Sequence, residues 1–193
     1  MAPDAPPPLA GVLETALYVD DMERARAFYE GVLGLAPMFA DARLTAYPVG
    51  GRSALLIFRR GAATETAHLP GGTIPPHDGA GPIHCAFSIA ADALPSWETR
   101  LAALGVAVEG RTEWRSSGPV RSTSIYFRDP DGHLLELATP GLWPGLRLRR
   151  PRRVSGPPAG RRNRPRPAVR GRRPWRAGPR TARPCRPRAA GWW

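Results

Sequence analysis

The stretch ETALYVDDMERARAFYEGVLGL, residues 14–35, joins a strand pattern to a helix pattern. Residues 14–19 are mostly apolar and β-prone, and their side chains alternate between two faces. The paired aspartates that follow can cap a helix, whose apolar residues recur at helical spacing as far as Gly34. The stretch therefore predicts a strand followed by an amphipathic helix, and it places Glu14 in an otherwise apolar strand.

A second copy of this pattern begins 70 residues further along the chain. HCAFSI, residues 84–89, aligns with ETALYV, and another amphipathic helix pattern follows it. β-prone runs come after each helix, at 36–40, 44–49 and 53–59 in the first half and at 106–111, 120–128 and 133–138 in the second. The sequence thus predicts an α+β fold, with one domain at 11–143 made of two βαβββ units, 11–61 and 81–143, after a flexible N-terminus at 1–10.

The charge is distributed unequally along the chain. The whole sequence carries a net charge of +12, yet residues 144–193 hold 17 of its 28 basic residues and none of its 16 acidic ones. This Arg/Pro-rich tail has ten prolines and no periodicity, so we expect it to be disordered. It has three open interpretations: an arm for nucleic acid, a membrane-surface tether, or a frameshift or read-through extension. Nucleic acid is not the expected partner, because few aromatic residues are present to stack on bases.

The sequence predicts neither export nor membrane insertion. Its N-terminus lacks the cationic start and apolar core of a signal peptide, and no run reaches the roughly 18 apolar residues that span a bilayer. Cys85 lies in a predicted strand and Cys185 in the tail, so we expect no disulfide between them. The expectation is a cytoplasmic protein.

Three polar side chains interrupt the predicted strands on the faces with smaller residues. Glu14 and His84 are equivalent positions of the two repeats, and Glu136 lies in the last strand of the second unit, where the first unit has Leu56. Alternation places the large apolar side chains on the opposite face, suited to packing under a helix. A buried carboxylate such as Glu14 would need a cation nearby. The three residues are therefore candidate metal ligands.

Two longer stretches carry a family resemblance. LYVDDMERARAFYEGVLGL, residues 17–35, and YFRDPDGHLLEL, residues 126–137, resemble the vicinal oxygen chelate superfamily. That superfamily includes glyoxalase I, extradiol dioxygenases, fosfomycin-resistance thiol transferases and metal-free bleomycin-binding proteins. The resemblance implies eight strands in two sheets curled around a cleft. It also implies metal ligands on the first strand of each unit and on the last strand of one or both.

By this resemblance His84 and Glu136 match metal ligands, whereas Glu14 stands where many members have His or Gln. Leu56 stands where glyoxalase I has a second glutamate. One imidazole and two carboxylates suit Fe²⁺, Mn²⁺, Zn²⁺ or Ni²⁺ and leave coordination positions open for a substrate that chelates through two oxygens. We therefore expect a homodimeric, metal-dependent lyase, isomerase or dioxygenase for a small oxygenated molecule, with Glu136 taking part in catalysis.

Other interpretations of the same residues stay open. The alternative function is a metal-free protein that binds or sequesters a small molecule, as in bleomycin resistance. Taken alone, Glu136 could pair with Arg128, and His84 could be a satisfied buried histidine. His77, in the loop before the second unit, is a candidate catalytic base or gate, or an ordinary loop residue.

The remaining polar residues are expected at the surface or along the cleft. His68 and His133 belong to no pattern, and we expect both at the surface. Arg52, Tyr126 and Arg128 fall on strand positions that alternation places along the cleft.

A chain truncated after Trp143 should keep its fold, because the tail beyond it carries no pattern of a packed element. We expect its melting temperature, followed by circular dichroism, to equal that of the full chain within about 2 °C. An insoluble or much less stable truncated chain would show that the tail is structural.

Overall fold

The computed structural model describes residues 5–115, 118–143 and 146. The expectations for residues 1–4 and for the tail, Cys185 included, therefore lie outside the described residues, apart from Leu146. Residues 5–13 contain no helix or strand. Every described helix and strand lies between residues 14 and 138, within the predicted domain. No described helix has the length and apolar character needed to cross a membrane.

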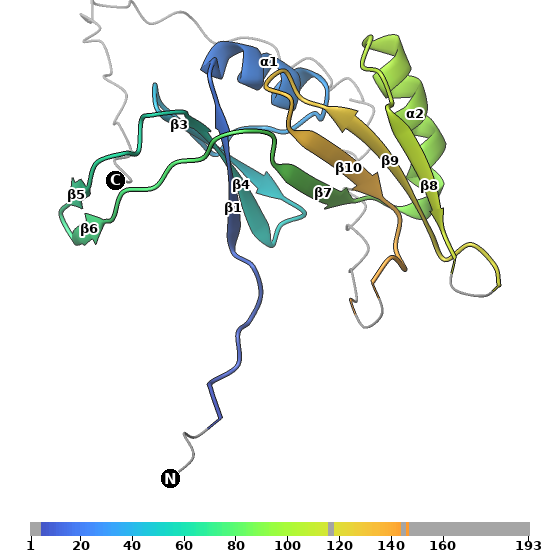
Figure 1. The fold of residues 1–193 in the computed structure, drawn as a ribbon, viewed down its shortest axis with the longest axis horizontal. Helices are drawn as coiled ribbons and strands as arrows, with labels where there is room; N and C mark the ends of the chain where they lie inside the picture. Colours follow the sequence, from blue (N-terminus) through green and yellow to red (C-terminus); the bar gives the residue numbers. More distant parts are fainter. Residues whose placement is uncertain (1–4, 116–117, 144–145, 147–193) are drawn as a thin grey trace, which may run out of the picture. The chain divides into compact units, whose positions relative to one another are not determined.

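The first half of the chain forms a four-stranded mixed sheet with one helix (Figure 1). Its elements are β1 (Glu14–Val19), α1 (Met22–Gly31), β2 (Phe39–Ala40), β3 (Leu44–Val49) and β4 (Ser53–Arg59). The strand order is β1-β4-β3-β2, with β1 parallel to β4 and the other pairs antiparallel. Asp21 caps α1 as predicted, since its carboxylate accepts the backbone N–H groups of Glu23 and Arg24 at 2.9 and 3.0 Å.

The second half has the same order of elements. They are β7 (His84–Ser88), the short 3-10 helix η1 (Ala91–Ala93), α2 (Leu94–Ala103), β8 (Gly110–Trp114), β9 (Ser122–Arg128) and β10 (Leu134–Ala138). The sheet order is β7-β10-β9-β8, again with only the first pair parallel. The strand predicted at 106–111 begins later, at Gly110, because the Val106 N–H still bonds to the Leu101 carbonyl at the end of α2.

A small hairpin in the connection between the halves was not predicted. It consists of β5 (Ala67–Leu69) and β6 (Gly72–Ile74), which within the described part of the chain pair only with each other. Within the described residues the strands therefore form two four-stranded sheets and this hairpin. A continuous eight-stranded sheet is not among them.

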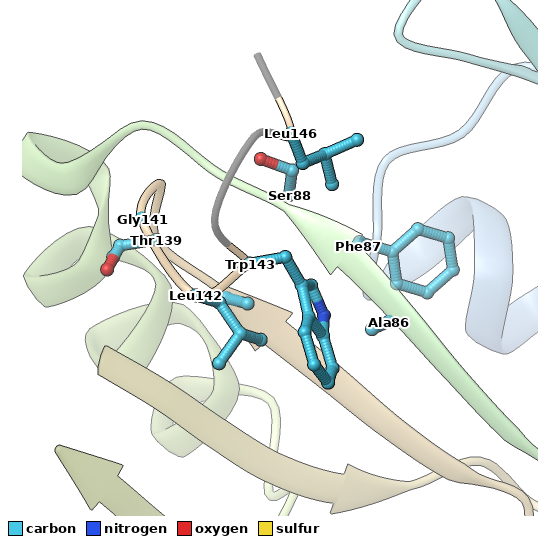
Figure 2. A pocket seen from close by; sticks show the side chains of 9 residues that line it. Ala86, Phe87, Ser88, Thr139, Gly141, Leu142, Trp143 and Leu146 are labelled. Carbon is cyan, nitrogen blue, oxygen red and sulfur yellow. The ribbon is translucent and has the colours of Figure 1, made fainter. Parts of the chain in front are cut away.

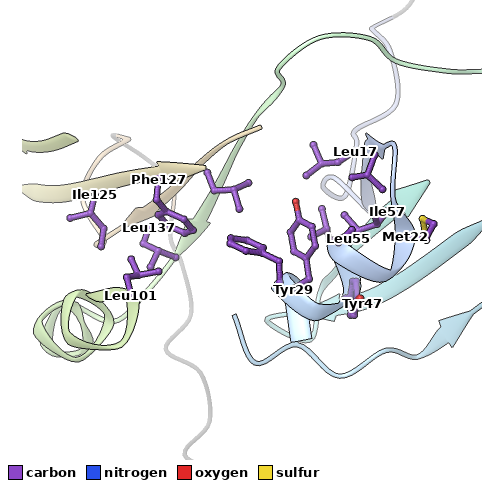
Figure 3. Packing of buried hydrophobic residues seen from close by; sticks show 14 of the residues in the cluster. Leu17, Met22, Tyr29, Tyr47, Leu55, Ile57, Leu101, Ile125, Phe127 and Leu137 are labelled. Carbon is purple, nitrogen blue, oxygen red and sulfur yellow. The ribbon is translucent and has the colours of Figure 1, made fainter. Parts of the chain in front are cut away.

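One hydrophobic cluster includes residues of both sheets and both helices (Figure 3). Leu101 of α2 lies against Ile125, Phe127 and Leu137 of the second sheet. Tyr29 of α1 lies among the apolar side chains of the first sheet. Alternation holds in β10, where Leu135 and Leu137 enter this cluster. The side chain between them, Glu136, consequently lies on the other face of its sheet.

The turn DPDGH, residues 129–133, is the main polar connection between the halves. Asp129 accepts the backbone N–H groups of Asp131 and His133 at 3.0 and 2.8 Å. It also accepts the hydroxyl of Tyr29 at 2.8 Å, and burial together with this carboxylate raises the pKa of Tyr29. Asp131 accepts the backbone N–H of Asp20 at 2.8 Å. The turn is thereby joined to α1 and to the end of β1.

His133 is fully buried, so the prediction that it lies at the surface was wrong. Its Nδ1 accepts the backbone N–H of Ile83 at 3.0 Å, and its Nε2–H donates to the carbonyl of Tyr18 at 2.9 Å. These partners are main-chain groups distant in sequence, which no local pattern marks. His68, by contrast, is exposed on β5 as expected.

Replacing His133 with Ala should destabilise the protein by roughly 2–4 kcal/mol, because it opens a cavity and leaves the Ile83 N–H unpaired. The Tyr18 carbonyl would lose one of its two donors and keep the other, Nη2 of Arg60. Urea unfolding followed by fluorescence measures this change in the free energy of unfolding. His68→Ala is the matched control and should change it by less than about 0.5 kcal/mol. Equal small effects for both variants would mean that the imidazole bridge does not hold the halves together.

Candidate metal centre

His84 and Glu136 are brought together on one face of the second sheet. They come from the neighbouring parallel strands β7 and β10, where His84 pairs in register with Leu134 and Glu136 with Ala86. The Nε2 atom of His84 lies 3.2 Å from Oε2 of Glu136. Half of the His84 side chain is exposed, at 49%, whereas only 5% of the Glu136 side chain is. The pair is therefore open to solvent from the histidine side.

The second ring nitrogen of His84 determines how this pair is held. Its Nδ1 lies 3.0 Å from the carbonyl oxygen of Leu134. A carbonyl can only accept, so Nδ1 carries the proton and donates it. In the neutral imidazole Nε2 then presents a lone pair to a carboxylate oxygen, and two acceptors at this distance repel each other. A cation, either a proton or a metal ion, must lie between them.

The other carboxylate oxygen of Glu136 also lacks a partner in the described part of the chain. Its Oε1 atom is buried and has no hydrogen-bond partner among the described residues. A buried carboxylate oxygen without a partner is costly. Imidazole nitrogen and carboxylate oxygen are also common ligands of divalent transition metals, and such imidazoles usually donate their other N–H to a carbonyl or carboxylate. The imidazole nitrogen of His84, the carboxylate of Glu136 and the unpartnered Oε1 atom are all consistent with two ligands of one metal ion.

Arg128 is not the partner of Glu136. Its Nε donates to Oε2 of Glu109 at 3.1 Å, and its Nη1 donates to the carbonyl of Gly132 at 2.7 Å. The interpretation of Glu136 as a strand glutamate paired with Arg128 is therefore wrong. Arg52, also expected along the cleft, is exposed in the turn between β3 and β4.

Tyr126 lies beside the pair on β9, in register with Glu136. Its ring centroid is 6.4 Å from that of His84. Burial, reinforced by the negative charge of Glu136, raises the pKa of the Tyr126 phenol. The phenol therefore stays protonated at neutral pH and supplies a hydrogen-bond donor next to the carboxylate.

Glu14 is not part of this pair. It is the first residue of β1, in the other sheet, pairs in register with Ala54 and is exposed. Its carboxylate is therefore solvated and needs no buried cation. Within residues 5–115, 118–143 and 146, no three His, Cys, Asp or Glu side chains lie close enough to hold a metal. The structure brings together two of the three candidate ligands.

His77 lies against the same face of the first sheet that carries Glu14. Its Nδ1 is 2.6 Å from the hydroxyl of Tyr18, which shares that face of β1. Its ring also contacts Phe58, with centroids 4.8 Å apart. Leu56 packs against the cluster that Tyr18 and Phe58 form. The sheet face that carries Glu14 therefore has one histidine next to it, and the rest of the residues named here are apolar or aromatic.

A pocket of about 230 Å³ lies along β7 and the end of β10, the two strands that carry His84 and Glu136 (Figure 2). It is mostly apolar and is lined by Ala86, Phe87, Ser88, Ala138, Thr139, Gly141, Leu142, Trp143 and Leu146. In Figure 2 the Trp143 ring lies between Leu142 and Ala86, the residue in register with Glu136. The sequence did not predict this pocket, because it forms only where the chain after β10 returns across the strand face.

Cys85, on the opposite face of β7, allows a chemical test of which face of this strand is exposed. Cys85 packs against the hydrophobic cluster, and burial raises the pKa of its thiol. In a Cys185→Ala variant, alkylation of Cys85 by iodoacetamide at pH 8 should be at least about tenfold slower in the folded than in the urea-unfolded chain, because thiolate content and access both fall. Equal rates would mean that β7 presents Cys85, and not His84, to solvent.

Comparison with known proteins assigns the chain to a family. The model of the Glyoxalase/Bleomycin resistance protein/Dioxygenase superfamily matches residues 11–137. Metallothiol transferase FosB of Shouchella clausii is 30% identical over 135 residues, 67% of this chain and 80% of that protein. FosB of Bacillus licheniformis is 53% identical over 57 residues, 29% of this chain and 34% of that protein.

A solved structure supports the same family assignment. The crystal structure of a lactoylglutathione lyase from Agrobacterium tumefaciens is 32% identical, with a TM-score of 0.63, over 72% of this chain and 99% of that chain. The match of the family model over most of the chain, and the relative that is similar over two thirds of it, agree with the resemblance carried by residues 17–35 and 126–137. The chain belongs to the glyoxalase/bleomycin resistance protein/dioxygenase superfamily.

Proposed function

We propose that this protein is a divalent-metal-dependent enzyme that acts on a small oxygenated substrate. The observation that carries the proposal is the His84–Glu136 pair, in which two acceptor atoms lie 3.2 Å apart and the other carboxylate oxygen is buried without a partner. The names of the relatives, a metallothiol transferase and a lactoylglutathione lyase, support reactions in which a thiol is joined to or carried by the substrate.

The metal centre is completed between two chains of a homodimer. Glu14 is exposed at the start of an edge strand, where a second chain can approach it. His84 and Glu136 of one chain and Glu14 of the other then hold one ion of Fe²⁺, Mn²⁺, Zn²⁺ or Ni²⁺. When bound, this ion would supply Lewis acidity toward two neighbouring substrate oxygens. The eight strands of the two contributing sheets, from two chains, enclose the substrate cleft.

The protein's own residues orient the ligands and handle protons. The Leu134 carbonyl fixes the ring of His84 so that Nε2 faces the site. Tyr126, protonated at neutral pH, is placed to donate a hydrogen bond to a substrate oxygen or to Glu136. His77 shares a face with Glu14 and, with Nδ1 on the Tyr18 hydroxyl, serves as a general base or gate. Leu56 contributes an apolar contact in place of a fourth ligand.

A metal-free binding protein is the competing function. It is favoured by the same pair, because a proton shared by His84 and Glu136 would also satisfy the two facing acceptors. The apolar pocket beside the pair would then serve a ligand held without metal. The two functions differ in whether purified protein contains stoichiometric metal.

The test is metal analysis of protein purified without chelator. The wild type should hold about one divalent ion per chain, and Glu136→Gln should weaken metal binding by more than about 100-fold, since it removes a charged ligand without changing its size. Glu109→Gln is the matched control, because that glutamate is exposed and pairs only with Arg128 among the described contacts. Wild-type protein that stays metal-free and resists loading would leave the binding-protein function.

Mixing two inactive variants tests whether the site is shared. Glu14→Ala chains and Glu136→Gln chains each lack a ligand, but a mixed dimer contains one intact site. After random exchange about a quarter of the sites should bind metal again. Metal content that stays at the level of the separate variants would mean that no site is shared between chains.

A further inference from the structure

The internal repeat allows the two sheets to be compared position by position. In the first strand of each half, Tyr18 and Ser88 are equivalent, 70 residues apart. In the last strand of each half, Phe58 and Ala138 are equivalent, 80 residues apart. The structure confirms this match, because in each sheet the two residues pair in register with each other. Each sheet thus has the same row of side chains, and in the second half this row lies one pleat beyond Glu136.

The row of the first half is filled with aromatic side chains. The rings of Tyr18 and Phe58 stack with their centroids 5.8 Å apart and their planes at 23°. The ring of His77 lies over them, 4.8 Å from Phe58 between centroids. Gly79 approaches so closely that a Cβ atom there would lie 2.5 Å from the Tyr18 ring. The first half therefore shows that flat aromatic rings fit on this row and are buried there.

The equivalent row of the second half has small side chains. Ser88 and Ala138 stand in the places of the two aromatic residues. The row continues with Ser124 on β9, where the first half has Leu44 on β3. The pocket of about 230 Å³ lies over the Ser88–Ala138 part of this row (Figure 2). The pocket therefore occupies the place that aromatic rings take in the first half.

The size and lining of the pocket match one aromatic ring. An apolar cavity of about 150 Å³ is enough to hold benzene, so this pocket has room for a ring with a short substituent. Trp143 forms part of its wall, where the indole can pack against a bound ring. The described residues that line the pocket include no charged side chain. An anionic group would lose its hydration there without gaining a counterion, whereas an uncharged ring would not.

The pocket lies within reach of the candidate metal ligands. Ala138 follows Glu136 by two residues on β10, and the two side chains lie on the same face, about 7 Å apart along the strand. Ser88 has the same relation to Ala86, the residue in register with Glu136. A molecule whose oxygens bind at the His84–Glu136 pair therefore reaches the pocket with a group on the adjacent carbon.

We propose that the substrate carries an uncharged aromatic ring beside its two metal-binding oxygens, and that this ring binds over Ser88 and Ala138 against Trp143. The position of the oxygens rests on the proposed metal-dependent function. The position of the ring rests on the repeat and on the pocket. The pocket then selects aryl-substituted vicinal diols or hydroxyketones over their methyl analogues.

Two diols that differ in one group test the ring site. Styrene glycol carries a phenyl group where propylene glycol carries a methyl group. Calorimetric titration of the wild type should show at least about tenfold tighter binding of styrene glycol, because its ring is buried in the pocket and a methyl group fills little of it. Equal affinities for the two diols would overturn the proposal.

A tyrosine at position 88 tests where the ring binds. Ser88→Tyr puts into the pocket the side chain that the first half has at the equivalent position, and Ser88 is exposed, so the variant should fold. It should bind styrene glycol no more than about twofold tighter than propylene glycol, because its own ring takes the place of the ligand's. Thr73→Tyr, at an exposed position of β6, is the matched control and should keep the preference. A Ser88→Tyr variant that also keeps it would reject the site.

Intermolecular nuclear Overhauser effects give a second result if the tyrosine variant does not fold. In the wild type, the phenyl protons of bound styrene glycol should show effects to the Ala138 methyl group and to the Trp143 indole. Effects to side chains of the first sheet alone, or the absence of both expected effects, would reject the site.

The outcome is separable from that of the proposed function. If the wild type prefers styrene glycol and Ser88→Tyr does not, but the wild type takes up no metal, the ring site holds and the metalloenzyme does not. If Glu136→Gln loses metal but the wild type binds both diols equally, the metal centre stands and the ring site fails.

Discussion

The buried imidazole of His133 is the contact on which the arrangement of the two halves depends. It accepts the Ile83 N–H just before β7 and donates to the Tyr18 carbonyl near the end of β1. Because it stands one residue before β10, it ties the first strand of each half to the strand that carries Glu136. The Asp129 carboxylate, bonded to Tyr29, holds the same turn against α1. The hydrogen bonds of His133 and Asp129 thus connect the elements of the two halves that surround the apolar core.

Within that frame the candidate metal centre follows from strand alternation. The side chains of Leu135 and Leu137 are buried against the core, which forces Glu136 to the other face, next to His84 of the parallel neighbour β7. The packing of the two leucines against the core therefore places the carboxylate of Glu136 on the opposite face of the sheet. The same rule places Glu14 on the open face of β1, but in a different sheet. One chain therefore holds two of the three candidate ligands close together, and the third, Glu14, lies apart from them.

The main features of the fold were predictable because they depend on local patterns. The strands at 44–49 and 53–59 lie where β-prone runs predicted them, and Asp21 caps its helix as its position suggested. The pairing of His84 with Glu136 was also accessible, since both positions follow from the repeat. His133 was misjudged, and the β5–β6 hairpin and the Trp143 pocket were missed. Each of these depends on contacts between segments far apart in the chain or on a connection with weak patterning.

The sequence alone determined the identity and the face of each candidate ligand, because side-chain alternation and the repeat are properties of the chain itself. It also determined the family, through the motifs around residues 17–35 and 126–137. Only the tertiary structure decided which ligands meet. His84 and Glu136 meet because β7 and β10 are hydrogen-bonded neighbours, whereas Glu14 stays exposed on another sheet's edge. Distances between strands come from packing and hydrogen bonding across the whole domain, which no spacing along the chain encodes.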